Sequence, residues 1–393
     1  MPDRIADINR IIRDVFPMVR DLRRDLHKHP EIQYEEVRTA GKVSAHLKRL
    51  KIPHRTKVGD TGVVALIKGK RRGKCVALRA DMDALPMPEA TGLPYRSVNE
   101  GKMHACGHDG HTANLVGVAH VLSRLKDELK GSVKLIFQPA EEAGERGGAE
   151  LMIRNGALRD PKPDVIFGLH TSHLYPVGSV AVRPGTMMAS ADFFDIVIRG
   201  RGAHAAYPHK GIDPIVIASA VLTELQTIVS RQLDPLQPAV VTIGQVQGGS
   251  ASNVIPEEVR LGGTCRAYDR RARRMLLSQI RKISVNVARA LGGSAEARLI
   301  KGYPPTINHD GPVAFLRETA AGALDAQNLV EAPPSMGGED FSFYMEKVPG
   351  AFFWLGNGRP EVSIHNPMFD FNDQALKTGM LVMSLLALRW PPE

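Results

Sequence analysis

The sequence lacks an uninterrupted apolar run of about 18 residues, the length that a helix needs to span a bilayer. Its first residues, Met1 to Asp7, contain no apolar stretch typical of a secretory signal. Cysteine is scarce: Cys75, Cys106 and Cys265 are an odd number spread over 393 residues, which argues against a disulfide framework and for a reducing compartment. Cys75 and Cys265 lie inside apolar strand patterns and are assigned to packing. We therefore expect a cytoplasmic protein with no membrane partner.

A basic stripe with interleaved aromatic residues is also absent. The chain has 51 Lys and Arg against 42 Asp and Glu, a formal net charge of +9, but apart from short clusters at residues 68–74 and 270–274 these charges are dispersed. Solvated surface charge explains such runs, so we expect no nucleic-acid partner, although a positive field would help to collect anionic substrates. With 43% hydrophobic and 24% charged residues, the composition is that of an ordinary globular protein.

The length of 393 residues exceeds the roughly 250–300 residues at which one hydrophobic core stops growing, so two domains are expected. Apolar residues at helical spacing predict a first helix over residues 4–29, which ends at His29-Pro30. Short β-branched runs predict strands at 62–67, 75–79, 133–137 and 165–168, and helical patterns at 115–129 and 148–155 separate several of them. This alternation predicts an α/β sheet with functional groups at the ends of its strands.

The pattern changes after residue 187. Strand, helix, strand, strand, helix and strand follow one another at 192–199, 214–231, 239–246, 257–267, 271–290 and 295–300. This β-α-β-β-α-β order is that of a ferredoxin-like α+β unit. We therefore predict a mixed-sheet α/β catalytic domain formed by residues 1–187 and 302–393, with a strand near 352–355 and a last helix over 373–388, and a ferredoxin-like domain inserted at 188–301.

Residues able to bind a metal gather where the predicted strands end. They are Asp81 and Asp83, the segment from His104 to His111, Glu141 and Glu142, His170, and, late in the chain, His365. Cysteine, histidine and glutamate are the usual ligands of zinc and its first-row neighbours. In the segment from His104 to His111, Cys106 and His108 flank Gly107, which suits an irregular loop that folds around an ion before a helix beginning near His111.

The adjacent Glu141 and Glu142 follow a predicted strand, so their side chains leave the chain in different directions. One of them can bind metal while the other takes a proton from water, as a metal-dependent hydrolase requires. A single histidine is more often a core or surface residue than a ligand, and a glutamate pair is usually solvated, but their joint placement at strand ends favours a metal site. His104 and His111 are assigned to bystander or supporting positions.

Six segments together resemble one family of enzymes. They are RDLHKHPE (residues 24–31), RADMDALP (79–86), HACGHDGH (104–111), FQPAEE (137–142), GAHAAYPH (202–209) and GGEDF (337–341). In unbroken order from about residue 20 to about residue 373, the chain resembles the metallopeptidase-like amidohydrolases that include hippurate hydrolase, N-acyl-amino-acid amidohydrolases and indole-acetyl-amino-acid hydrolases. The joint occurrence is specific, whereas any single segment is not.

The resemblance implies a centre with two divalent metal ions in the α/β domain. The ligands that it implies are Cys106, which bridges the ions, and His108, Glu142, His170 and His365. Glu141 is then the general base, and Asp83 orients a ligand and polarises the centre. Thiolate and imidazole favour zinc, but manganese, nickel or cobalt also suit such a site.

The resemblance also implies that the inserted domain mediates a homodimer or a higher homo-oligomer. His204 matches a histidine that reaches toward the metal centre of the partner subunit to stabilise an oxyanion, and a surface-loop histidine is the alternative. Asn253 and Arg266 are candidates for binding the substrate carboxylate, because an arginine fork binds a carboxylate bidentately, although Arg266 equally suits a structural salt bridge. Gly337 and Gly338 are expected to line the substrate site.

The expected reaction is hydrolysis of the amide bond of a small N-acyl amino acid, of the hippurate or N-acetyl type, to a carboxylic acid and a free amino acid. A dipeptidase or aminopeptidase on the same scaffold and a metal-binding protein without activity are the alternatives, and Glu141 beside Glu142 argues against the latter. Two positions depart from the family pattern, His173 and Ile364, and they concern substrate preference rather than metal ligands. The acyl group, the amino acid and the stereochemistry depend on pocket shape, which the sequence does not specify.

Overall fold

The computed structural model describes residues 2–390 and divides the chain into two compact units. Unit 1 comprises the chain up to Met187, Ile307–Pro333 and the part from Asp340 onward, and unit 2 comprises Met188–Thr306 and Pro334–Glu339. The chain passes from one unit to the other near β7 (Gly185–Met188) and β14 (Thr306–Asn308). Over residues 2–390, no helix has both the length and the apolar character needed to cross a membrane.

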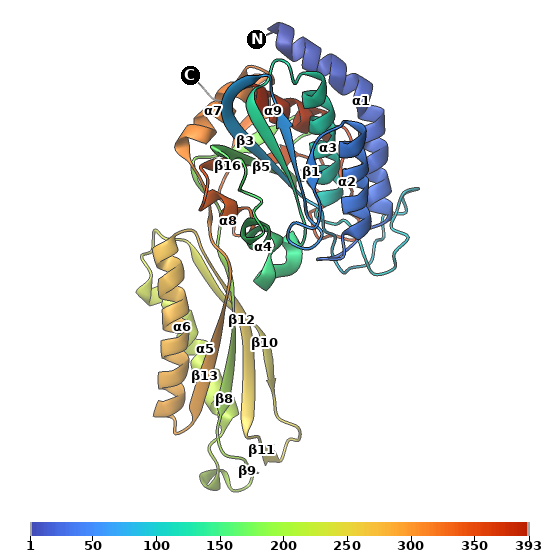
Figure 1. The fold of residues 1–393 in the computed structure, drawn as a ribbon. Coiled ribbons are helices and arrows are strands. Elements are labelled where there is room, and N and C mark those ends of the chain that lie inside the picture. The colour runs from blue at the N-terminus through green and yellow to red at the C-terminus, as the bar shows by residue number, and fades with distance from the viewer. Residues whose placement is uncertain (1, 391–393) are drawn as a thin grey trace. The chain divides into compact units, whose positions relative to one another are not determined.

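Unit 1 is built on an eight-stranded mixed sheet with the strand order β1-β2-β4-β3-β5-β16-β6-β15. Figure 1 labels β1, β3, β5 and β16 of this sheet. The strands are β1 (His54–Arg55), β2 (Val63–Lys68), β3 (Arg71–Asp81), β4 (Lys130–Gln138), β5 (Val165–Ser172), β6 (Val180–Val182), β15 (Leu329–Glu331) and β16 (Gly350–Gly356). β4, β3, β5 and β16 are parallel neighbours, whereas β2 and β6 run antiparallel to β4 and β16. The predicted α/β fold with a large mixed sheet is confirmed.

Helices bury the central strands of this sheet. The helices of unit 1 are α1 (Pro2–Lys28), α2 (Val37–Arg49), α3 (His108–Arg124), α4 (Gly148–Arg154), α7 (Asp310–Ala321), α8 (Ser342–Met345) and α9 (Ala375–Arg389). α3 and α9 lie against the sheet, and α1 packs on both of them through an apolar stripe that includes Ile8, Ile12, Val15 and Val19. Because α3 and α9 are themselves buried along most of their length, the strands that they cover form the centre of the main hydrophobic core.

The start of α3 differs from the prediction. The sequence pattern placed it near His111, but α3 begins at His108, immediately after Gly107. Gly107 has a φ of 84°, in the left-handed region, and a Cβ at this position would lie 2.6 Å from Cγ2 of Thr171. Glycine is therefore required at the turn that starts the helix, and His108 takes the first helical position. α2 and α7 were not predicted.

Unit 2 has a four-stranded antiparallel sheet in the order β10-β12-β8-β13. Its elements follow as β8 (Ala191–Arg199), α5 (Pro214–Thr227), β10 (Ala239–Gly248), β12 (Glu258–Ala267), α6 (Arg270–Ala290) and β13 (Ser294–Tyr303). An aspartate caps the N-terminus of each helix: the Asp213 side chain accepts a hydrogen bond from the backbone N–H of Ile215, and Asp269 accepts from those of Arg271 and Ala272. A separate two-stranded sheet joins β9 (Ala203–His204) to β11 (Val254–Ile255).

Candidate metal centre

Parallel pairing brings the polar residues of three strands to one edge of the unit 1 sheet. Asp81, the last residue of β3, is in register with Gln138, the last residue of β4, and β5 runs parallel to β3 on its other side. Asp83 follows β3, Glu141 and Glu142 follow β4, and His170 lies near the end of β5. The carboxyl end of the parallel strands is where open α/β sheets bind ligands.

The structure brings the five predicted metal ligands together in two groups that share Cys106. The first group is Cys106, His108 and His170, and the second is Cys106, Glu142 and His365; within each group the ligand atoms lie within 4.8 Å of one another. The Cys106 sulfur is 3.2 Å from Nε2 of His170, and Nε2 of His365 is 3.2 Å from a carboxylate oxygen of Glu142. A sulfur shared by two sets of ligands is the arrangement that a bridging ligand between two ions requires.

The orientation of the imidazoles fits a pair of cations. His108 Nδ1 lies 2.9 Å from the backbone carbonyl oxygen of Asp83, and Nδ1 of His170 lies 2.7 Å from that of Thr171. A carbonyl oxygen only accepts, so in their neutral form both rings carry their proton on Nδ1 and present the lone pair of Nε2. Within residues 2–390, the buried Nε2 of His108 has no hydrogen-bond partner. A buried polar atom of this kind, beside a thiol and a carboxylate, is accounted for by a metal ligand bond.

The carboxylates around Cys106 and His108 also favour binding of a cation in this cluster. Burial, followed by the nearby carboxylates of Glu142 and Glu141, raises the pKa of the Cys106 thiol well above its usual value. Burial lowers the pKa of His108, but Asp81 and Asp83 outweigh it and raise this pKa to about 10. A divalent cation supplies the positive charge that these anionic groups attract, and it favours the thiolate form of a coordinating cysteine.

Asp83 holds the two glutamates by their backbone. Its buried carboxylate accepts hydrogen bonds from the N–H groups of Glu141, at 3.0 Å, and of Glu142, at 2.9 Å. The same side chain lies 3.2 Å from Nδ1 of His108. One carboxylate therefore fixes a candidate ligand on α3 and the loop that carries the candidate base. The carboxylate of Glu141 itself accepts a long hydrogen bond, 3.5 Å, from the N–H of Asp340.

A second buried carboxylate, Asp81, supports the strand that carries His170. Asp81 accepts from Arg79 at 2.7 Å and lies 2.6 Å from Nδ1 of His111, whose Nε2 accepts the backbone N–H of Thr171 at 2.8 Å. Since both oxygens of Asp81 are occupied, the group formed by Asp81, His108 and His111 is a support rather than an additional ion site. The sequence pattern marked Asp81 only as a polar residue at a strand end, because nothing local links it to Thr171.

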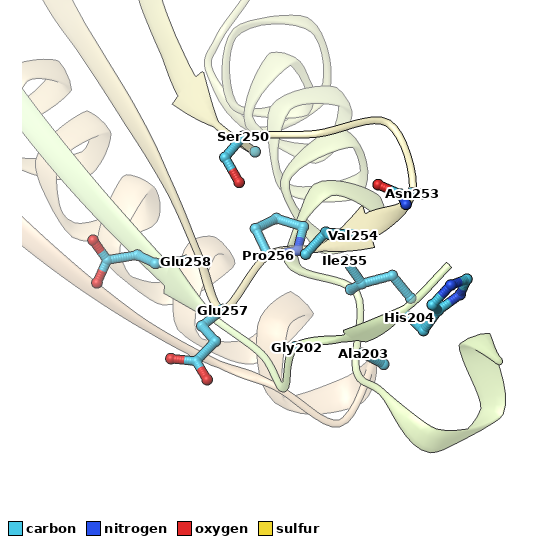
Figure 2. A pocket seen from close by; sticks show the side chains of 11 residues that line it. Gly202, Ala203, His204, Ser250, Asn253, Val254, Ile255, Pro256, Glu257 and Glu258 are labelled. Atoms are coloured by element: carbon cyan, nitrogen blue, oxygen red, sulfur yellow. The ribbon is translucent and has the colours of Figure 1, made fainter. Parts of the chain in front are cut away.

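The candidate site residues of unit 2 form two separate groups. Near β9 and β11, His204 and Asn253 line a pocket of about 700 Å³ together with Gly202, Ser250, Pro256 and Glu258, among others (Figure 2). His204 is exposed, and its Nδ1 accepts the N–H of Ala206 at 3.1 Å, so that the neutral ring carries its proton on Nε2. The ring therefore presents a hydrogen-bond donor outward.

Arg266 lies near the other end of β12. It is half-buried, burial lowers its pKa, and it makes no ion pair within the part of the chain that the structure describes. A Cβ on Gly338 would lie 3.3 Å from Nη1 of this arginine, so the absence of a side chain there leaves space beside the guanidinium. Gly337 is adjacent in the same short segment. The structural salt bridge considered from the sequence is not observed for Arg266 within residues 2–390.

Comparisons with known proteins agree with this geometry. Residues 77–389 match the model of peptidase family M20/M25/M40. The chain is 42% identical to an N-acetylcysteine deacetylase of Bacillus subtilis (strain 168), over 94% of this chain and 95% of the relative, and 41% identical to the IAA-amino acid hydrolase ILR1-like 4 of Arabidopsis thaliana, over 96% and 86%. Among solved structures, the YXEP protein of Bacillus subtilis, described as a dinuclear metal binding peptidase from the M20 family, superposes with a TM-score of 0.84 at 37% identity, covering 96% of this chain and 98% of that one.

Proposed function

Because the chain belongs to peptidase family M20/M25/M40, and is similar to an N-acetylcysteine deacetylase and an IAA-amino acid hydrolase, we propose that it hydrolyses the amide bond of small N-acyl amino acids. The products are a carboxylic acid and a free amino acid. The observation that carries this proposal is the convergence of Cys106, His108, Glu142, His170 and His365 beside the second glutamate, Glu141.

In this proposal the five ligand residues hold two divalent ions, whose identity among zinc, manganese, nickel and cobalt is open. Such ions lower the pKa of a coordinated water from 15.7 to about 7 and polarise a carbonyl oxygen. Glu141 takes a proton from the attacking water and returns it to the leaving amine. Its backbone N–H is held by Asp83 and its carboxylate by the N–H of Asp340, which orients the carboxylate for this transfer.

The two groups of candidate residues in unit 2 support a site completed by a second subunit. Glu258, beside the His204 pocket, and Arg266 lie at opposite ends of β12, eight residues apart in an extended strand, which corresponds to about 26 Å. A small N-acyl amino acid is too short to touch both ends. We therefore assign Arg266, Gly337 and Gly338 to one subunit, and His204 with Asn253 to its partner.

With this assignment, unit 2 acts as the dimerisation domain, and residues 188–301 form the inserted ferredoxin-like domain of a homodimer or a higher homo-oligomer. The Arg266 guanidinium binds the substrate carboxylate, assisted by Asn253 of the partner subunit. The partner's His204 donates its Nε2–H to the oxyanion that forms at the amide carbonyl, since the N–H of Ala206 already occupies Nδ1.

The test is a hydrolysis panel run on metal-stripped protein and on protein reconstituted with each of the four metals. N-acetyl, N-benzoyl and N-indoleacetyl amino acids are compared with dipeptides of the same amino acids. We expect metal-dependent cleavage of at least one acylated series and weaker cleavage of the dipeptides. Preferential cleavage of dipeptides assigns the chain to the dipeptidase or aminopeptidase class, and unchanged activity after complete metal removal contradicts the proposal.

A further inference from the structure

The segment between α1 and α2 carries a buried carboxylate that the proposed reaction does not use. Glu36 has no exposed surface, although glutamate is among the residues least often buried. It lies just after the motif at residues 24–31, which has no assigned role in the proposed reaction. Such a side chain is kept inside a protein only where its oxygens accept hydrogen bonds.

Those hydrogen bonds lead to the loop of the two glutamates. Oε1 of Glu36 accepts the backbone N–H of Ala140 at 2.8 Å and that of Tyr34 at 3.0 Å, and Oε2 accepts the hydroxyl of Thr61 at 2.5 Å. From the same segment, Nε2 of Gln33 donates to the backbone carbonyl of Glu142 at 2.8 Å. Two side chains from the α1–α2 connection thus form hydrogen bonds with the backbone at residues 140 and 142.

The hydrogen bond from Glu36 reaches a constrained point of this loop. Ala140 adopts a φ of 54°, in the left-handed region that residues with a Cβ seldom occupy. The N–H groups of three consecutive residues are all bound by carboxylates, Ala140 by Glu36 and the next two by Asp83. Without Glu36, the first of these N–H groups is buried and unpaired, and the left-handed turn that aims the glutamates loses its anchor.

We propose that Glu36, assisted by Gln33, is a positioning residue that holds the turn at Ala140 and thereby sets the directions of Glu141 and Glu142. This inference rests on the proposed function for its effect on catalysis, but not for its effect on the loop. The role requires an acceptor, not a charge, because Oε1 receives both N–H groups while Oε2 faces a hydroxyl that can donate or accept. In line with this, burial and then the charge of Asp83 raise the pKa of Glu36 to about 7.

The experiment compares three variants. Glu36→Gln keeps the acceptor oxygen, Glu36→Ala removes it, and Glu35→Gln is the matched control, since Glu35 is the neighbouring glutamate, is 59% exposed and pairs with Lys102 at the surface. The first readout is hydrogen exchange of a peptide covering residues 139–144 in the metal-free protein, measured by mass spectrometry. The second is kcat and KM of the metal-loaded protein on its best N-acyl amino acid.

Glu36→Ala should lose the exchange protection of this peptide and lose about 100-fold in kcat with little change in KM, because a small misplacement of a catalytic group costs that much. Glu36→Gln should keep the protection and stay within about tenfold of wild-type kcat, since a neutral hydrogen bond has about half the strength of one to a charged acceptor. Glu35→Gln should match wild type in both.

Two outcomes overturn the proposal. One is wild-type exchange in Glu36→Ala, or, should that variant fail to fold, loss of protection in the folded Glu36→Gln protein. The other is loss of kcat in Glu36→Gln with the loop protection intact, which would mean that the proton or charge of Glu36 matters and not its position. If no N-acyl amino acid is hydrolysed by wild type, the proposed function fails, whereas the exchange measurement still tests the role of Glu36.

Discussion

Replacing Asp83 by asparagine tests how much of the metal centre depends on one support. The carboxylate of Asp83 is 1% exposed and serves three donors: Oδ1 faces the N–H of Glu141 and Nδ1 of His108, and Oδ2 faces the N–H of Glu142. Asparagine has almost the same shape but only one acceptor oxygen. In either orientation of the amide, its NH₂ group faces at least one of the backbone N–H groups, so at least one buried donor loses its acceptor.

The loss of one acceptor sets the expected size of the effect on stability and on metal affinity. A buried donor left unpaired costs about 1–3 kcal/mol, and loss of a residue that orients a metal ligand typically weakens metal affinity about 10- to 100-fold. The better orientation keeps the oxygen at Oδ1, so that His108 and Glu141 stay in place and the loss falls on Glu142. We therefore expect Asp83→Asn to fold, to bind metal within this weaker range and to lose kcat in proportion.

The assay is calorimetric titration of the metal-stripped protein with zinc or manganese, together with the thermal midpoint and kcat. Asp127→Asn is the matched control, because Asp127 is 57% exposed and forms a surface ion pair with Lys70. Wild-type metal affinity and wild-type kcat in Asp83→Asn would refute the reasoning, since the hydrogen bond from Asp83 to the N–H of Glu142 would then not determine the geometry of the centre.

Three further results are expected. Glu141→Gln should bind metal as wild type does but lose about 10²- to 10⁴-fold in kcat, as expected when a general base is removed, and near-normal kcat would show that the base is misassigned. His204→Ala should also be almost inactive, and mixing it with Glu141→Gln should restore activity if His204 acts across subunits, because one site of each mixed dimer is then complete; no recovery places His204 in its own subunit's site. Burial and then His46 lower the pKa of His120 to about 4, below its value of 6.5 in the unfolded chain, so its contribution to stability is present above pH 6.5 and is lost as the pH falls toward 4. Between pH 7 and pH 5, the thermal midpoint of His120→Gln should therefore fall less than that of wild type. An equal fall in both proteins would contradict the burial of a neutral imidazole at this position.

The sheet edge and the candidate ligands are the features that the sequence predicts best. β5 is an unbroken buried run, and the polar residues stand at the ends of such runs or directly after them, so strand-end placement follows from local pattern alone. The spacing of Cys106 and His108 and the adjacent pair Glu141 and Glu142 are local features of the same kind. By contrast, the residue at which α3 begins depends on the left-handed Gly107 and on its close approach to Thr171, which is 64 positions away in the chain.

The residues that hold the site in place through hydrogen bonds cannot be recognised from the sequence in the same way. Glu36 and Ala140 are 104 positions apart, and Asp81 lies 30 positions from His111. An isolated glutamate or aspartate next to other polar residues predicts a solvated surface, because local pattern does not reveal which backbone N–H groups will be buried beside it. The space that Gly338 leaves beside Arg266 is hidden in the same way, since α6, β13 and a return to unit 1 separate the two residues along the chain.

The left-handed residues explain why so many supports are needed. Ala140 and His365 both have positive φ angles, 54° and 62°, and such a conformation costs an L-residue about 1–2 kcal/mol. Each is held from a remote part of the chain: Ala140 by Glu36, and His365 by its N–H, which donates to the carbonyl of Ala105 at 2.8 Å. Neither lies in a regular strand or helix, so no ladder of hydrogen bonds fixes it, and these single contacts must do so. The residues that carry the chemistry can therefore be recognised by type and spacing, whereas the directions of their side chains depend on partners that only the folded chain brings near.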